Sequence, residues 1–132
     1  MGNERIIADT CIWIDYFRGT DPISKALLGL IQGGEIRITG PVVYELLQGT
    51  KTKEDADVIK EATQALPKLA VTHDTWLLAG DLFFDLRRKG VTLPPSDVLL
   101  SALAIENNCA IMTTDNHFDQ ISKIRRYPLP GK

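Results

Sequence analysis

The segment "IIADTCIWID" at residues 6–15 decides the fold, because it joins a buried strand to a carboxylate and then to a helical stretch. Ile6, Ile7 and Ala8 are typical of a strand core, and Asp9 follows them without a break. Asp is common in turns and at helix N-caps, so Asp9 has a simple structural explanation. In a parallel sheet, however, ligands bind beyond the ends of the strands. The rest of the chain has to decide between these two roles for Asp9.

The chain has 132 residues and is 44% hydrophobic, which predicts one globular domain with a real core. No uncharged apolar run approaches the roughly 18 residues that a membrane span requires. The first residues, "MGNERI", have neither the apolar region of a signal peptide nor the hydroxyl residue of a myristoylation motif at position 6. We therefore expect a cytoplasmic protein that makes no membrane contact.

The formal net charge is −2, from 15 basic and 17 acidic residues, which is not typical of a protein that binds nucleic acid by overall charge. Two local basic clusters, "RRK" at 87–89 and "KIRR" at 123–126, are either ordinary solvated surface or, on one face, a polyanion contact. The only two cysteines, Cys11 and Cys109, lie in apolar contexts and are expected to be buried thiols rather than a disulfide.

Strand and helix patterns alternate along the chain, which predicts an α/β fold: a mainly parallel central sheet with helices on both faces. The strands are expected at residues 4–8, 35–39, 68–72 and 109–114. The helices are expected at residues 12–18, 22–34, 41–47, 52–66, 74–89, 95–108 and 116–122. The one Pro-rich break, "VTLPPSD" at 91–97, is too short for a linker. We expect a single domain over residues 1–132, with its core at about 4–122 and a basic, irregular tail at 123–132.

Acidic residues follow two of these strands. Asp9 and Asp115 should meet at one edge of the sheet, since the carboxyl ends of parallel strands lie together. Asp97 opens the buried helix at 95–108, where it could simply complement the helix dipole. Glu45 falls just beyond the apolar side of its helix, which alone suggests solvated surface. Asp119 stands four residues after Asp115 and would share a helical face with it.

Carboxylates that cluster repel one another and raise each other's pKa values, and a divalent cation removes that cost. Oxygen ligands favour Mg²⁺ or Mn²⁺, which can activate water for phosphodiester hydrolysis. The chain has only two histidines and no Cys/His cluster, so zinc, Ser-His-Asp and Cys-His chemistry are not expected. It also lacks a GxxxxGK[ST] loop and a GxGxxG turn, and "DTC" lacks the second acid of a DxD phosphatase.

Four segments follow in order, "IIADTCIWIDYFRG", "ITGPVVYELLQG", "PPSDVLLSALAIENN" and "IMTTDNHFDQI", and each includes one of the acids Asp9, Glu45, Asp97 and Asp115. Together they resemble a PIN-domain ribonuclease, specifically the VapC-type toxin of toxin–antitoxin (VapBC) pairs, over about residues 5–122. The resemblance implies a PIN-like three-layer α/β/α sandwich and a Mg²⁺- or Mn²⁺-dependent endoribonuclease. It also implies an RNA substrate, a homodimer, and a cognate VapB-type antitoxin that blocks the site with its C-terminal segment.

The resemblance assigns roles to individual acids. The family's catalytic acids correspond to Asp9, Glu45, Asp97 and Asp115. Of these, Asp9, Asp97 and Asp115 would hold the metal, directly or through water. Glu45 would bind a second metal or orient the attacking water, which is compatible with its place beyond the apolar side of the helix.

Three further residues would support these acids. Thr10 follows the first acid, and Thr113 stands two residues before the fourth; their hydroxyls would hydrogen-bond the carboxylates or the phosphate. Asp119 matches a position that is often acidic in such toxins and is less regularly catalytic.

Two other functions remain open from the sequence. A PIN-like RNA- or protein-binding module would bind its partner without turnover, and a metal phosphatase on a doubly wound sheet would hydrolyse small phosphomonoesters. A metal-dependent cleavage assay on RNA separates both from an endoribonuclease.

Overall fold

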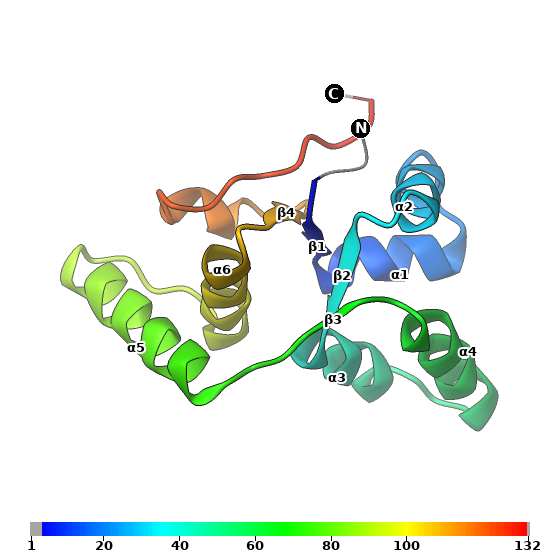
Figure 1. Cartoon of the computed structure of the whole chain (residues 1–132), viewed down its shortest axis with the longest axis horizontal. Helices are drawn as coiled ribbons and strands as arrows, with labels where there is room; N and C mark the ends of the chain where they lie inside the picture. The colour runs from blue at the N-terminus through cyan, green and yellow to red at the C-terminus, as the bar shows by residue number, and fades with distance from the viewer. Residues whose placement is uncertain (1–3, 132) are drawn as a thin grey trace.

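A four-stranded parallel sheet organises the protein, as a computed structural model covering residues 4–131 shows (Figure 1). The strands are β1 (Ile6–Ala8), β2 (Ile36–Thr39), β3 (Lys68–Leu69) and β4 (Ala110–Met112). Their spatial order is β3-β2-β1-β4, and every neighbouring pair is parallel. The predicted α/β fold with a mainly parallel sheet is confirmed.

Helices connect the strands and form the two outer layers. They are α1 (Thr10–Arg18), α2 (Ile23–Gln32), α3 (Gly40–Gln48), α4 (Lys53–Gln64), α5 (His73–Arg88) and α6 (Pro95–Asn107). In Figure 1, α5 and α6 lie on one side of the sheet, and α1 and α2 lie on the other. Neighbouring helices pack in pairs, α1 on α2, α3 on α4 and α5 on α6. A short 3₁₀ helix, η1 (Asn116–Gln120), follows β4.

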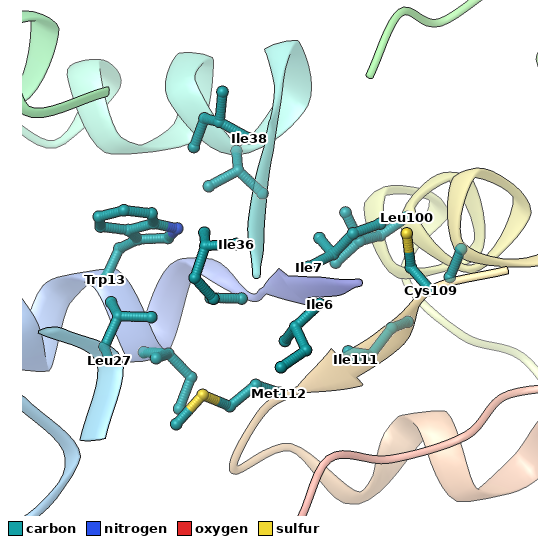
Figure 2. Close-up of a cluster of buried hydrophobic side chains, with 14 of the residues drawn as sticks. Ile6, Ile7, Trp13, Leu27, Ile36, Ile38, Leu100, Cys109, Ile111 and Met112 are labelled. Carbon is teal, nitrogen blue, oxygen red and sulfur yellow. The ribbon is translucent and has the colours of Figure 1, made fainter. Parts of the chain in front are cut away.

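The core lies on both faces of the sheet, as expected where helices cover both sides of parallel strands. Ile7 of β1 and Ile36 of β2 are completely or almost completely buried. Figure 2 shows Trp13 and Leu27, from α1 and α2, beside Ile36, and Leu100 of α6 beside Ile7. Burial of these side chains stabilises the fold by roughly 1.5–3 kcal/mol each.

The order of the strands reverses at β1, which makes this strand the topological switch point of the sheet. The chain runs outward from β1 through β2 to β3, and then returns to place β4 on the other side of β1. The backbone amide of Asp9 donates to the Met112 carbonyl at 2.9 Å, so the ends of β1 and β4 are held side by side. Ligands of open parallel sheets bind at such a switch point.

Several element bounds differ from the sequence prediction, and three of these differences have a clear local cause. Helix α1 begins at Thr10 rather than at residue 12, because the Asp9 side chain caps it. Strand β3 is shorter than residues 68–72, because the chain turns into α5, which Thr72 caps by accepting from the Thr75 amide. The helix expected at 116–122 is the 3₁₀ helix η1.

The segment after residue 123 returns to the sheet. The amide of Ile111 donates to the Arg125 carbonyl at 2.8 Å, and the Tyr127 amide donates to the Ile111 carbonyl at 2.8 Å. Through these two bonds, Arg126 pairs with Ile111 in an isolated parallel β-bridge. None of the helices in residues 4–131 combines the length and apolar character that crossing a bilayer requires.

Candidate metal centre at the carboxyl edge of the sheet

Asp9 combines the two roles that its sequence context left open. Its Oδ1 accepts a hydrogen bond from the Thr10 amide at 2.8 Å and so caps α1. Its Oδ2 accepts from the hydroxyl of Thr113, which follows the neighbouring strand β4, at 2.8 Å. Capping uses one oxygen, and the other is oriented toward the strand end that carries Asp115.

Thr113 links the two strand ends. Its side chain is completely buried, and its hydroxyl donates to Asp9 while accepting from the backbone amide of Asp115 at 3.0 Å. Because a buried hydroxyl is costly without partners, this pair of bonds holds Asp9 and Asp115 in a defined relation.

Asp97 and Asp115 converge on His117. The Nδ1 atom of His117 lies 3.0 Å from Oδ2 of Asp97 and 3.0 Å from Oδ2 of Asp115. One ligand atom from each of these three residues lies within 4.8 Å of the others, which is close enough to share a cation. The other carboxylate oxygen of Asp115 accepts from the His117 amide at 2.9 Å and caps η1.

The electrostatics show that the acids act on one another. Burial raises the pKa of Asp97; the negative charges of Asp9 and Asp115 raise it further, and the hydrogen bond from His117 opposes them. The hydrogen bond to Asp97 raises the pKa of His117, and the charge of Asp115 adds to it. Asp9 therefore lies near Asp97, although it is outside the tight group of Asp97, Asp115 and His117. A divalent cation would relieve this repulsion, so the donor set fits one.

Glu45 joins the same edge through α1. The Thr10 hydroxyl donates to Oε1 of Glu45 at 2.7 Å, and the carboxylate is half-buried rather than fully solvated. Val42 and Leu46 of the same helix point into the core, so Glu45 lies beside the apolar face of α3. Thr10, the residue that follows Asp9, thus links Glu45 to the same edge of the sheet through its hydroxyl.

Asp119 points elsewhere. Because η1 is a 3₁₀ helix with about three residues per turn, residues four apart do not share a face, and the expected pairing with Asp115 is wrong in its geometry. Asp119 instead accepts from Arg126 at 3.1 Å, and Arg126 also donates to the Thr113 carbonyl at 2.7 Å. A supporting role for Asp119 would run through Arg126.

The two cysteines differ. Both are free, and Cys109 is buried as expected. Cys11 is only half-buried, and its sulfur lies 3.7 Å from Oδ2 of Asp9 and 3.7 Å from the Thr113 hydroxyl. The expectation of a buried Cys11 thiol is wrong, because the first turn of α1 places the sulfur beside the polar side chains of Asp9 and Thr113.

His117 is not among the residues that the sequence predicts for the site. The one feature of the sequence that could have indicated His117 is its position two residues after Asp115. The short 3₁₀ helix η1 brings a residue at this position into contact with Asp115 and Asp97. An isolated His beside an acid is more often a surface residue, so the spacing alone did not reveal it.

A hollow of about 930 Å³ lies away from these acids, between β2, α3, α4, β3 and the start of α5. Its lining is mostly apolar and includes Val43, Leu47, Leu69 and Trp76. Because none of the acids lines it, the volume of this hollow does not locate the chemistry.

A parallel sheet with carboxylates gathered at its switch point defines a class of α/β domain suited to binding a divalent cation. Residues 6–124 match the family model of the PIN domain, and the chain belongs to this family.

A curated relative and two solved structures are similar to this chain, and the two structures share its fold. The chain is 28% identical over 124 residues to ribonuclease VapC11 of Mycobacterium tuberculosis, covering 90% of this chain and 92% of that one. A structure of VapBC2 from Rickettsia felis bound to promoter DNA superposes with a TM-score of 0.79 at 22% identity, covering 92% and 96% of the two chains. A toxin–antitoxin complex from Klebsiella pneumoniae gives 0.76 at 19% identity, covering 94% and 99%.

Proposed function

We propose that this protein is a metal-dependent endoribonuclease and the toxin of a type II toxin–antitoxin pair. The observation that carries the proposal is the convergence of Asp97 and Asp115, with Asp9 beside them, at the switch point of a PIN-domain sheet. The similarity to a protein named as a ribonuclease, over nine-tenths of both chains, supports the reaction class.

Mg²⁺ or Mn²⁺ is the cofactor that the site is proposed to take. Asp97 and Asp115 would hold the ion, and Asp9 would contribute directly or through water. When bound, such an ion supplies positive charge that acidifies water and offsets the charge of the phosphate.

The chain's own residues then position the reaction. The Thr113 hydroxyl holds Asp9, and the Thr10 hydroxyl holds Oε1 of Glu45, which leaves Oε2 of Glu45 to accept the proton of the attacking water. The water oxygen forms a bond to phosphorus as Glu45 takes its proton, the bond from phosphorus to a ribose oxygen breaks, and that oxygen takes up a proton from solvent water.

The partners and location of the protein are part of the same proposal. The solved structures that resemble this chain include VapBC2 of Rickettsia felis and a toxin–antitoxin complex of Klebsiella pneumoniae, which supports a cognate VapB-type antitoxin for this chain. We propose a cytoplasmic homodimer in which residues 1–132 act as one PIN domain. Large apolar side chains that stay exposed in the single chain, among them Trp76 at 58% and Phe84 at 60%, support association. Light scattering on the purified protein would give the mass of a dimer.

The test is cleavage of total RNA by the purified protein with Mg²⁺ or Mn²⁺, with the cuts mapped by sequencing of the new ends. Asp97→Asn should lower the cleavage rate by about 100-fold or more, since it removes a ligand worth several kcal/mol of charge stabilisation. Asp81→Asn, an exposed acid on α5, is the matched control and should cleave at the parental rate. Parental cleavage by a folded Asp97→Asn protein would contradict the proposed site.

The same assay separates the alternatives. A binding module would retain RNA without cutting it at any metal concentration. A phosphatase would hydrolyse a small phosphomonoester such as p-nitrophenyl phosphate and leave the RNA intact.

A further inference from the structure

His117 is placed as a ligand would be placed in the centre described above. Its Nδ1 is equidistant, at 3.0 Å, from one oxygen of Asp97 and one oxygen of Asp115. A nitrogen between two carboxylate oxygens can be satisfied in two ways: it can donate a hydrogen to them, or it can bind a cation together with them. The same three donor atoms serve both arrangements, because they already lie within 4.8 Å of one another.

The way η1 presents His117 holds its Nδ1 beside both carboxylates, as a shared ligand position requires. Asp115 caps η1 through Oδ1, which fixes the backbone of His117 and aims its ring at Oδ2 of the same carboxylate. Asp97 arrives from the first turn of α6, where its side chain is 14% exposed, whereas the His117 side chain is 50% exposed. Of the three donor side chains, the imidazole is therefore the most exposed and the Asp97 carboxylate the least exposed.

Imidazole changes which cation such a site prefers. Mg²⁺ is bound mainly through oxygen ligands, whereas transition-metal ions accept imidazole nitrogen readily. We propose that His117 is a nitrogen ligand of the metal centre and that it biases the site toward Mn²⁺ over Mg²⁺. This inference rests on the proposed metal-dependent function and adds the residue that sets its choice of ion.

The direct test is electron spin echo envelope modulation of Mn²⁺ bound to the purified protein, which detects a ¹⁴N nucleus coordinated to manganese. The parent should show a nitrogen modulation, and His117→Asn should lose it. His73→Asn is the matched control, because His73 is the only other histidine and is exposed at the start of α5; it should keep the modulation.

Binding of the two ions provides the second readout. Calorimetric titrations with Mn²⁺ and Mg²⁺ should show the ratio of the two affinities falling by about tenfold or more in His117→Asn, and staying unchanged in His73→Asn. Circular dichroism confirms that each variant is folded.

The outcomes separate this inference from the proposed function. Absence of nitrogen modulation in the parent, or its persistence in His117→Asn, overturns the role of His117 even if RNA is still cut in a metal-dependent way. Nitrogen modulation that depends on His117 in a protein that never cuts RNA supports the ligand and contradicts the nuclease. A protein that binds neither ion contradicts both.

Discussion

Thr113 is the residue that couples the two strand ends of the centre, although it carries no charge. Its hydroxyl donates to Asp9 and accepts from the Asp115 amide, and its side chain is completely buried. One hydroxyl therefore fixes the orientation of one acid and the backbone position of another.

Replacing Thr113 by Val keeps the volume and removes both hydrogen bonds. We expect the Mn²⁺ affinity to fall by about 10–100-fold, because partners of metal-binding carboxylates have effects of that size. The free energy of unfolding should fall by about 1–3 kcal/mol, because a buried donor and acceptor lose their partner. Calorimetry and denaturant unfolding measure the two effects. Thr113→Ser keeps the hydroxyl and should keep most of the affinity; equal affinities for the Val and Ser variants would refute this role.

His117 makes the stability of the metal-free protein depend on pH. Its pKa is raised above the ordinary value of 6.5, chiefly by the hydrogen bond to Asp97. The folded state therefore binds the proton more tightly than the unfolded state, so the contribution is fully present below pH 6.5 and disappears as pH rises through the raised pKa.

In EDTA, the parent should consequently exceed His117→Asn in melting temperature by more at about pH 5.5 than at about pH 8.5. Thermal unfolding at both pH values measures the difference, with His73→Asn measured alongside as the matched histidine substitution. A gap that is the same at both pH values would show that the contact with Asp97 does not favour the protonated ring.

At the scale of elements, α6 positions Asp97 by being buried along most of its length. Residues from Val98 to Ala104 are all buried, and the Ser101 hydroxyl donates back to the Asp97 carbonyl at 2.8 Å. The buried helix α6 thus holds Asp97 of its first turn in a fixed position.

Leu103→Ala should lower the free energy of unfolding by about 2–5 kcal/mol, because Leu103 is completely buried and its loss leaves a cavity. Leu77→Ala, on the exposed side of α5, should cost less than about 1 kcal/mol. Denaturant titrations give both values. A cost for Leu103 as small as that for Leu77 would mean that α6 is not held by its core contacts.

The elements were largely predictable from the sequence, whereas their ends and one contact were not. Alternating apolar strands and helical stretches predicted the parallel sheet, and the resemblance placed the acids in segments that the structure brings to one edge. The end of β3 depends on the Thr72 cap, which outweighs the strand-like pattern of 68–72. The direction of the Asp119 side chain depends on the 3₁₀ geometry of η1 and on its hydrogen bond with Arg126. Arg126 lies close to Asp119 only because the C-terminal segment returns to pair with β4.

At the scale of the whole molecule, charge limits how RNA can be held. The net charge is −2, and two of the basic residues predicted to form a cluster are already engaged. Arg125 pairs with Glu4 at 2.8 Å, and Arg126 pairs with Asp119 at 3.1 Å. The other cluster, at residues 87–89, stays exposed at the end of α5.

RNA binding should therefore depend only moderately on salt. With two to three phosphate contacts, the affinity of Asp97→Asn for a single-stranded RNA should fall by less than about 100-fold between about 50 mM and about 200 mM salt. Fluorescence anisotropy without divalent ions measures this change. A fall of about 1,000-fold or more would show that many more cations contact the RNA than the structure suggests.

The central claim is that the acids at the β1–β4 switch point hydrolyse RNA through a bound divalent cation. The most direct measurement is the chemistry of the RNA ends produced by the purified protein, with Mn²⁺ or Mg²⁺ and with EDTA. We expect cuts that require the metal, vanish in EDTA, return when the metal is restored, and leave no 2′,3′-cyclic phosphate, because water and not the ribose 2′-hydroxyl attacks. Cuts that persist in EDTA and end in 2′,3′-cyclic phosphate would contradict it.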